Sequence, residues 1–263
     1  MTLLRRIWRL TLMALIVLAG IVITLVLWLP KRLRWINYDH ILGIASLWFR
    51  CLLFAMGARV TVHGTLSSRP GMWISNHISW LDIMVIGSQA RVHFVSKAEV
   101  RRWPVVGFLA AQTGTLFLRR GANESGEMAK LMSRRIKEGH GVLFFPEGTT
   151  GHGDYLRRFH PRLFAAAIEL QQPIIPLAVR YESEPQPHPL VPYTKEQNLM
   201  SNLWSLLGLK RLRITLFAPT TINELGDQRR ALADRCREVI RESLNLPAPA
   251  LPPEQVLAER RAR

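Results

Sequence analysis

The sequence is poor in acidic residues and in cysteine. Its 19 Asp and Glu residues are set against 35 Lys and Arg residues, which gives a formal net charge of +16. Such an excess favours a polyanionic partner, either nucleic acid or the anionic lipid of a cytoplasmic membrane leaflet. The two cysteines, Cys51 and Cys236, have no metal-type spacing and suggest no disulfide framework, which is typical of a reducing compartment.

Several motifs of common enzyme classes are also missing. No G-x-x-x-x-G-K-[ST] loop occurs, and Gly139, Gly141 and Gly148 do not form a G-x-G-x-x-G fingerprint, so a kinase or a dinucleotide-dependent enzyme is not expected. There is no G-x-S-x-G nucleophile elbow, so a serine esterase would lack its strained turn. His152 could be grouped with nearby carboxylates, but no ligands recur at i, i+4 spacing, and no metal is expected.

The twenty residues from 10 to 29 carry no charge. A helix of this length is about 30 Å long, close to the thickness of the hydrocarbon core of a bilayer. Basic residues follow it where a cleavable signal peptide would have small residues. We therefore expect a retained membrane anchor, with a cleaved signal and a buried helix as the alternatives.

A second apolar stretch, residues 41 to 58, is interrupted by Arg50 and is expected to form a helix lying in the membrane interface. Basic residues flank the first stretch on both sides, so the positive-inside rule does not orient a single span. A stretch that enters one leaflet and returns would keep both flanks on the cytoplasmic side. This monotopic arrangement is a hypothesis.

After residue 58, short β-branched and aromatic runs alternate with helical patterns, which is typical of α/β proteins. We expect a single mixed, mostly parallel sheet of about seven strands flanked by helices. Asp227 is expected to cap the last helix. The predicted domains are a membrane anchor and interfacial helix, a main domain and a flexible Pro-rich basic tail, at residues 1–58, 59–246 and 247–263. Strands are predicted at 59–64, 72–76, 92–96, 115–118, 142–145, 174–181 and 212–218, and helices at 80–88, 105–112, 124–138, 161–171, 197–207 and 227–245.

The segment NHISWLD follows a predicted strand and places His77 five residues before Asp82. Ser79 and Asp82 match the S-x-x-[DE] capping box, which is a structural role. On a continuous helix the two side chains would point about 140° apart, so a contact requires His77 in the turn before the helix. There, the carboxylate would orient the imidazole and leave its other nitrogen basic. From these residues alone, the catalytic and the capping role both remain open.

Three further segments carry polar or special residues near predicted strands. FPEGTT follows a strand, so Glu147, Gly148 and Thr149 are expected at its carboxyl end, where open α/β sheets bind ligands. GTLFLRR ends in Arg120. PIIPLAV contains Pro176 inside a strand-like run, where proline predicts an edge, a bulge or a loop.

In this order, N-H-x-x-x-x-D, G-x-x-F-x-x-R, F-P-E-G-T and a proline-containing apolar strand resemble the four motif blocks of the glycerolipid and lysophospholipid acyltransferase family. Its best-known members are the 1-acylglycerol-3-phosphate acyltransferases. The resemblance covers about residues 59 to 218 and includes Lys97, in a segment similar to the family's Lys-x-Glu. It implies an apolar anchor in a bacterial-type inner membrane, with the catalytic domain on the cytoplasmic side.

The resemblance also implies residue roles. His77 would be the general base that takes the proton of the acceptor hydroxyl as it attacks an acyl thioester, and Asp82 would orient it. Lys97 would assist with phosphate or oxyanion charge, and Glu147 would hold Arg120 or its own loop. The acceptor-binding blocks would comprise Gly114, Phe117, Arg120, Glu147, Gly148 and Thr149, and the structural residues near them Asn76, Pro146 and Pro176.

The implied function is a membrane-bound enzyme that transfers a fatty acyl group to 1-acyl-sn-glycerol-3-phosphate and forms phosphatidic acid. The co-substrate would be acyl-ACP or acyl-CoA, with no further cofactor. Membrane lipids, a lysophospholipid and the acyl carrier protein or CoA thioester are the expected partners, and no nucleic acid is expected. Alternatives are a hydrolase of the same thioester and a basic lipid-binding module without turnover.

Two departures bear on the acceptor. Many relatives have Arg after F-P-E-G-T, where this chain has Thr150, and the segment that follows reads RRFHPRLF. Both features resemble a branch that includes enzymes acting on lyso-ornithine lipid as well as some acting on lysophosphatidic acid. Lyso-ornithine lipid or another lysophospholipid is therefore the alternative acceptor.

Overall fold

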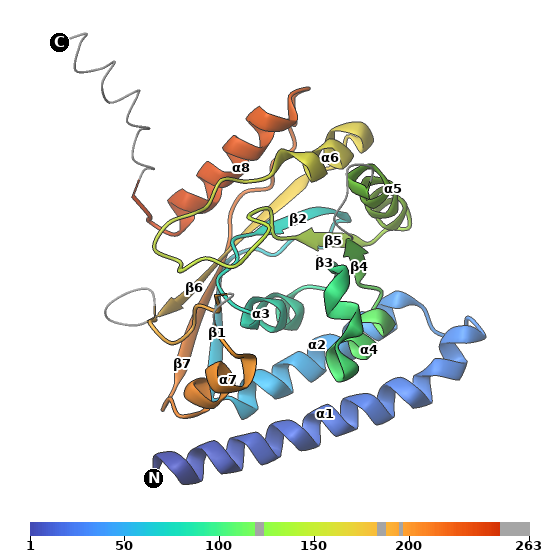
Figure 1. Ribbon diagram of the computed structural model, residues 1–263. Coiled ribbons are helices and arrows are strands. Elements are labelled where there is room, and N and C mark those ends of the chain that lie inside the picture. The colour runs from blue at the N-terminus through green and yellow to red at the C-terminus, as the bar shows by residue number, and fades with distance from the viewer. Residues whose placement is uncertain (119–123, 183–187, 195–196, 248–263) are drawn as a thin grey trace, which may run out of the picture.

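The structure, a computed structural model, describes residues 1–118, 124–182, 188–194 and 197–247 (Figure 1). Its elements lie close to the predicted ones. The strands are β1 (Ala58–Gly64), β2 (Gly71–Ser75), β3 (Val92–Lys97), β4 (Leu116–Leu118), β5 (Gly141–Phe144), β6 (Ile174–Glu182) and β7 (Leu212–Ala218). The helices are α1 (Thr2–Arg32), α2 (Tyr38–Ala55), α3 (Leu81–Gln89), α4 (Pro104–Gln112), α5 (Glu124–Lys137), α6 (Ala165–Leu170), α7 (Leu199–Leu207) and α8 (Arg229–Ser243), with short 3-10 helices η1 (Ala98–Arg102) and η2 (Pro161–Phe164).

The seven strands form one sheet in the order β1-β7-β6-β2-β5-β3-β4. Neighbouring strands are parallel, except that β6 and β7 are antiparallel. The prediction of a single mixed, mostly parallel sheet is confirmed. Since β2, β3, β5 and β6 run in the same direction, the loops that follow them meet at one edge of the sheet.

Helices cover both faces of the sheet, with α1, α2, α3 and α7 on one side and α5, α6 and α8 on the other (Figure 1). Alternation along the central strands accounts for this arrangement, because successive side chains point to opposite faces. In β2, Trp73 lies in the first hydrophobic cluster, while Met72 and Ile74 lie in the second. A strand buried on both faces reads as an unbroken apolar run, which is how GMWIS appears in the sequence.

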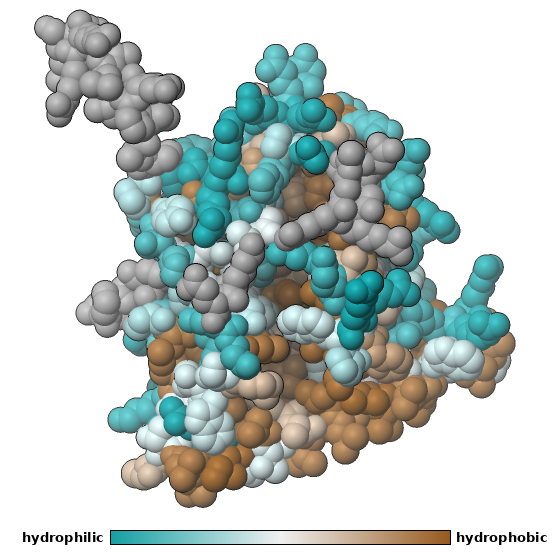
Figure 2. All heavy atoms as spheres, in the orientation of Figure 1, coloured by the Kyte–Doolittle hydropathy of each residue, from teal (hydrophilic) through white to brown (hydrophobic). Residues whose placement is uncertain are grey.

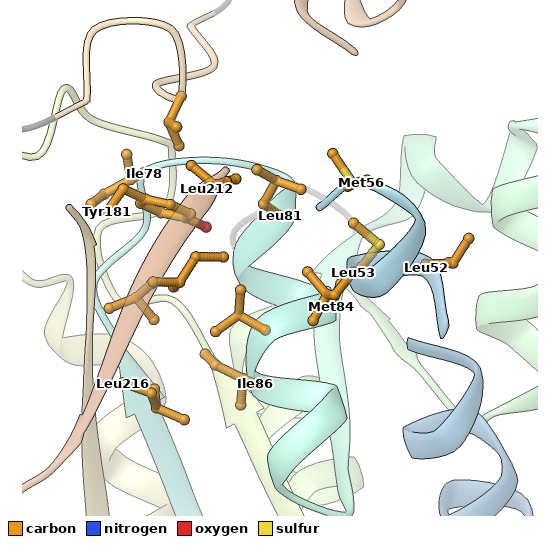
Figure 3. Close-up of a cluster of buried hydrophobic side chains, with 14 of the residues drawn as sticks. Leu52, Leu53, Met56, Ile78, Leu81, Met84, Ile86, Tyr181, Leu212 and Leu216 are labelled. Atoms are coloured by element: carbon orange, nitrogen blue, oxygen red, sulfur yellow. The ribbon is translucent and has the colours of Figure 1, made fainter. Parts of the chain in front are cut away.

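Helix α3 lies at the centre of the first cluster, between β7 and α2 (Figure 3). Its Leu81 and Ile86 are fully buried, and each such side chain stabilises the fold by about 1.5–3 kcal/mol. Helix α2 is bound to α3 by Ser46 Oγ, which donates to the Gly87 carbonyl oxygen at 2.5 Å, and by Arg50 Nε, which donates to the Ser88 carbonyl oxygen at 2.8 Å. Arg50, which interrupts the apolar stretch in sequence, thus joins α2 to the domain.

Helix α1 is long and apolar enough to cross a membrane by length and composition, but it lies along the domain (Figure 1). Near its start, buried Arg9 donates to the carbonyl oxygens of Leu207 and Leu209 at 3.1 and 2.6 Å. Near its end, Lys31 Nζ donates to the Gln112 carbonyl oxygen at 2.7 Å. Apolar side chains gather along its outer face (Figure 2), and the exposed ones include Leu4, Trp8, Leu15, Leu18, Val22, Val26 and Trp28.

Two local predictions need correction. Pro176 does not lie in an edge strand, because β6 is an interior strand and Pro176 is in register with Ile74 of β2. The ladder between β6 and β7 begins only at Ala178, so the missing N–H of Pro176 costs no bond of that ladder. Asp227 does not cap α8, whose N-cap position is Gln228 with no side-chain cap hydrogen bond.

Candidate active site

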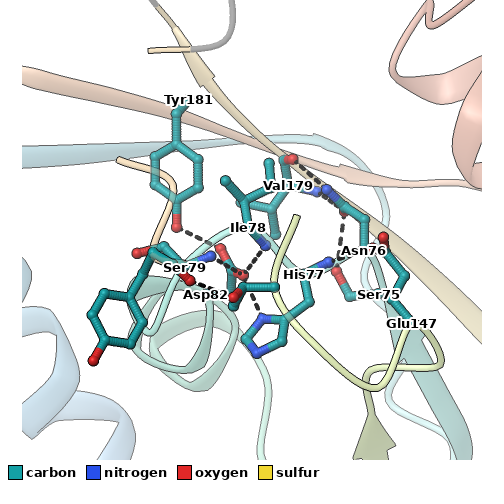
Figure 4. Close-up of polar contacts among 11 residues, drawn as sticks. Ser75, Asn76, His77, Ile78, Ser79, Asp82, Glu147, Val179 and Tyr181 are labelled. Carbon is teal, nitrogen blue, oxygen red and sulfur yellow. Dashed lines mark hydrogen bonds and ion pairs between the residues drawn. The ribbon is translucent and has the colours of Figure 1, made fainter. Parts of the chain in front are cut away.

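His77 and Asp82 meet directly beyond the carboxyl end of β2 (Figure 4). The Nδ1 atom of His77 lies 2.8 Å from Oδ2 of Asp82. His77 occupies the turn between β2 and α3, and α3 begins only at Leu81. The turn therefore removes the angular separation that a continuous helix would impose on two residues five apart.

The Asp82 carboxylate is fully buried and accepts four hydrogen bonds. Oδ2 accepts from His77 Nδ1 and from the backbone N–H groups of Ile78 and Ser79 at 2.8 and 2.9 Å. Oδ1 accepts from the Tyr181 hydroxyl at 2.6 Å. Only half of the capping box forms, since Ser79 Oγ has no hydrogen-bond partner in the part of the chain that is described. One carboxylate thus serves both the start of the helix and the imidazole.

The geometry fixes the tautomer of His77. An ionised carboxylate only accepts hydrogen bonds, so Nδ1 carries the proton that is donated to Asp82, and Nε2 keeps its lone pair. The ring stacks on Phe145, with ring centroids 3.9 Å apart and planes 13° apart. The side chain is 18% exposed, so the ring can be reached from solvent at the edge of the sheet. A histidine held in this way can accept a proton at Nε2 and return it.

Glu147, on the loop after β5, is buried and joins two loops. Its Oε1 accepts from the His77 backbone N–H at 2.8 Å, and its Oε2 accepts from the Arg157 backbone N–H at 3.0 Å. Burial raises the pKa of this carboxyl group, and the two backbone N–H donors oppose that rise. The Gly151 N–H donates to the His77 carbonyl oxygen at 2.8 Å, so the FPEGT loop holds the His77 backbone from both sides.

Other residues predicted for the site divide between the two ends of the strands. Lys97 is the last residue of β3, on the His77 edge, and Phe117 lies inside β4 with the Arg101 guanidinium 5.6 Å from its ring centroid. Gly114 precedes β4 and so lies at the amino end of the strands. Its φ of +79° is a conformation that favours glycine, and a Cβ at this position would lie 2.7 Å from His93 Nδ1. Arg120 lies outside the described residues.

The remaining predicted residues shape the loops. Asn76 bridges β2 to β6, since its Nδ2 donates to the Val179 carbonyl oxygen at 3.0 Å and its Oδ1 accepts from the Val179 N–H at 2.8 Å. Gly148 has a φ of +68° in the turn after β5, a conformation that favours glycine, and half-buried Thr149 follows it. The carbonyl oxygen of buried Pro146 accepts from the His160 N–H at 2.9 Å.

The sequence prediction missed Tyr181, which lies 99 positions from Asp82. Its hydroxyl is fully buried, and burial, with the adjacent Asp82 charge, raises its pKa well above the ordinary value. Tyr181 therefore remains a neutral donor to the carboxylate. The available signal was the alternation in β6, which places Tyr181 on the same face as Leu177 and Val179, where a buried tyrosine needs a hydrogen-bond partner.

A histidine that a buried carboxylate holds in this way fits an enzyme that moves a proton during group transfer. Comparison with known proteins shows that the chain belongs to the acyltransferase family. Residues 59–180 match the family model described as Acyltransferase. The chain is similar to a lyso-ornithine lipid O-acyltransferase of Pseudomonas aeruginosa, with 36% identity over 75% of this chain and 76% of that protein. It shares 30% identity with a lyso-ornithine lipid O-acyltransferase of Rhodobacter capsulatus, over 88% of this chain and 87% of that protein.

A 1-acyl-sn-glycerol-3-phosphate acyltransferase of Neisseria gonorrhoeae is 31% identical over 64% of this chain and 66% of that protein. Among solved structures, the chain resembles the 1-acyl-sn-glycerophosphate acyltransferase PlsC of Thermotoga maritima, with a TM-score of 0.54. That likeness covers 87% of this chain and 95% of the other at 18% sequence identity, so it shows a shared fold. The family suggested by the four motif blocks is confirmed.

Proposed function

We propose that this enzyme transfers a fatty acyl group from acyl-ACP or acyl-CoA to the free hydroxyl of 1-acyl-sn-glycerol-3-phosphate and forms phosphatidic acid. The observation that carries the proposal is the His77 and Asp82 pair, fixed at the carboxyl edge of the sheet with Nε2 of His77 free of the carboxylate. The formal charge of +16 suits the anionic acceptor, the anionic donor and a membrane surface.

In the proposed reaction, His77 Nε2 takes the hydroxyl proton of the acceptor while the hydroxyl oxygen attacks the thioester carbonyl carbon. The tetrahedral intermediate collapses as the C–S bond breaks, and the imidazolium returns the proton to the departing thiolate. Asp82 stabilises the imidazolium between these steps and keeps the ring in place. The thioester supplies the acyl group, and no covalent acyl-enzyme is required.

A second acceptor, lyso-ornithine lipid, is favoured by two specific observations. Relatives named for this acceptor are 36% and 30% identical to the chain over 75% and 88% of its length. In addition, Thr150 stands where many relatives have Arg, and its hydroxyl donates to the Tyr193 carbonyl oxygen instead of offering a positive charge. The reaction at the hydroxyl is the same for both acceptors, and the headgroup distinguishes them.

We also propose that the enzyme is monotopic, on the cytoplasmic side of a bacterial-type inner membrane. Support comes from α1, whose two ends are bonded to the same domain through Arg9 and Lys31. A helix held at both ends by one domain does not carry its N-terminus to the opposite side of a bilayer. The outward apolar residues of α1 would instead enter one leaflet, as interfacial helices do.

One experiment tests acceptor and side together. Inside-out and right-side-out membrane vesicles that contain the enzyme receive acyl-CoA, which does not cross the membrane, with one lysolipid acceptor at a time. Mass spectrometry of the lipid products should show phosphatidic acid with 1-acyl-sn-glycerol-3-phosphate, and only in inside-out vesicles. If ornithine lipid is the sole product, the acceptor is lyso-ornithine lipid and not 1-acyl-sn-glycerol-3-phosphate. Release of CoA without any acceptor would indicate a hydrolase, and no turnover at all would indicate a binding module.

A further inference from the structure

The loop after β5 is held in place at several points, and Arg157 lies within it. The Arg157 backbone N–H donates to Glu147 Oε2 at 3.0 Å. Its carbonyl oxygen accepts from Arg237 Nε at 3.1 Å, and the Leu156 carbonyl oxygen accepts from Arg237 Nη2 at 2.6 Å. Bonds to Glu147 within the loop on one side and to Arg237 of α8 on the other therefore fix where the Arg157 side chain starts.

The Arg157 side chain runs towards the His77 turn. A Cβ placed on Gly151 would lie 3.8 Å from Arg157 Nε, 3.7 Å from Glu147 Oε2 and 3.8 Å from the His77 carbonyl oxygen. Gly151 is thus surrounded by the guanidinium group, the loop carboxylate and the backbone of the proton-accepting residue. Arg157 therefore brings a positive charge to this group.

The guanidinium group has hydrogen-bonding capacity left over. Nε of Arg157 is buried and has no hydrogen-bond partner among the described residues. Both oxygens of the nearby Glu147 carboxylate are already engaged by backbone N–H groups, and no ion pair shorter than 4.0 Å joins that carboxylate to Arg157. A buried N–H donor without a partner is costly, so the half-buried Arg157 guanidinium group is expected to find an anionic acceptor.

Thr150, the residue that follows F-P-E-G-T, offers no charge to this edge of the sheet. Its hydroxyl donates to the Tyr193 carbonyl oxygen. Arg157 comes seven residues later on the same loop and brings a guanidinium group near the backbone of the His77 turn. Its planar fork matches the oxygens of a phosphate or a carboxylate.

We infer that Arg157 binds the anionic headgroup of the lysolipid acceptor and so positions its hydroxyl at His77. The inference rests on the proposed function, because it requires a lysolipid acceptor at this edge of the sheet. The bound chemistry is an anionic oxygen group, which could come from the acceptor headgroup or from the phosphates of the donor, and Arg157 is assigned to the acceptor.

The test compares Arg157→Gln, Arg157→Lys and Arg158→Gln in the full-length enzyme. Arg158 is the adjacent, exposed arginine, so its substitution removes the same charge from the same loop. We expect Arg157→Gln to raise the KM for 1-acyl-sn-glycerol-3-phosphate by about 10- to 100-fold, as loss of a charge-assisted hydrogen bond predicts. The KM for acyl-CoA should stay within about twofold, and Arg157→Lys should be intermediate because it keeps the charge without the fork.

The donor arm uses an acyl N-acetylcysteamine thioester, which has no phosphate. If Arg157 binds the acceptor, the Arg157→Gln defect persists with this donor. A defect that disappears with this donor, a raised KM for acyl-CoA alone, or an equal defect in Arg158→Gln would each overturn the inference. Should Arg157→Gln fail to fold, as shown by its melting curve, Arg157→Lys decides by the same KM comparison. Absence of acyl transfer in the unsubstituted enzyme refutes the proposed function itself, and is thereby distinguished from a negative result for Arg157.

Discussion

Two histidines lie at opposite ends of the same sheet and differ in what holds them. His77 follows β2 at the carboxyl edge, where Nδ1 donates to the buried Asp82 carboxylate. His93 is the second residue of β3, at the amino edge, and its Nδ1 donates to the Thr113 carbonyl oxygen at 3.0 Å. Both rings are packed against aromatic side chains, so packing alone does not tell them apart.

The two histidines differ in the charged groups around them and in their access to solvent. Burial lowers the pKa of His93 to about 4, and the nearby His140 and Arg135 add to that effect. His93 is almost fully buried, and its Nε2 has no hydrogen-bond partner in the described part of the chain. His77 has a carboxylate to stabilise its protonated form, and it keeps an exposed edge. A histidine can exchange protons with a substrate when both conditions hold, and His93 meets neither of them.

The largest expected effect comes from removing the ring at the carboxyl edge. His77→Ala should lower the rate of acyl transfer by about 10²- to 10⁴-fold, because general-base assistance is lost. The measurement is lipid product formed per enzyme at saturating donor and acceptor. Its matched control is His93→Asn, which should keep the rate within about twofold. A His77→Ala enzyme that retains more than a tenth of the activity would contradict the general-base role.

A smaller effect on activity is expected from substitution of Tyr181, which donates a hydrogen bond to Asp82. Tyr181→Phe removes the hydroxyl that donates to Asp82 Oδ1 and leaves that buried oxygen without this partner. A hydrogen bond to a charged group contributes roughly 1.5–3 kcal/mol, part of which is expected as lost stability. We expect kcat to fall about tenfold, with both KM values unchanged, because the carboxylate orients His77 less firmly. A raised KM with unchanged kcat would show that Tyr181 acts on substrate binding and not through Asp82.

Substitution of His93, at the amino edge of the sheet, is expected to have the smallest effect on activity. It should also have a separate effect on stability. His93 has a pKa of about 4 in the folded protein against an unperturbed value of 6.5. Between these values the unfolded chain binds a proton that the folded protein does not, so stability is lost as pH falls from about 6.5 towards 4. The contribution is at most about 3 kcal/mol.

His93→Asn keeps a donor for the Thr113 carbonyl oxygen and removes this titration. The melting temperature of the variant should therefore fall less than that of the unsubstituted enzyme when the pH is lowered from 7 to 4.5. Equal losses for the two proteins would show that His93 is not responsible for the acid sensitivity.

Much of the fold followed from local patterns, because each strand is a short apolar run and each run is bounded by turn residues. The contact between His77 and Asp82 was also within reach, since it depends on a single turn between β2 and α3. Pro176 was misjudged because its place in the sheet depends on where the β7 ladder begins, 36 or more positions further along the chain. Asp227 was misjudged because α8 begins later than predicted, so that Gln228 and not Asp227 occupies the N-cap position.

The contacts that sequence patterns could not supply are those that join distant segments. Tyr181 reaches Asp82 from β6, 99 positions further along the chain, and the Glu147 carboxylate joins the His77 turn to the Arg157 backbone. No periodic pattern in the sequence indicates such pairs. Gly114 is a further long-range case, since its backbone lies close to His93, 21 positions away in the sequence.

The long-range bond from Tyr181 to Asp82 has a consequence for biosynthesis. A nascent chain that has emerged only as far as the loop after β5 already carries His77, Asp82 and Glu147. It has neither the Tyr181 hydroxyl nor the Val179 backbone to which Asn76 is bonded. The buried carboxylate would then be short of one donor, and the turn that carries the imidazole would have no anchor on β6. The hydrogen-bond network around the proton-accepting pair is therefore complete only after β6 has been made.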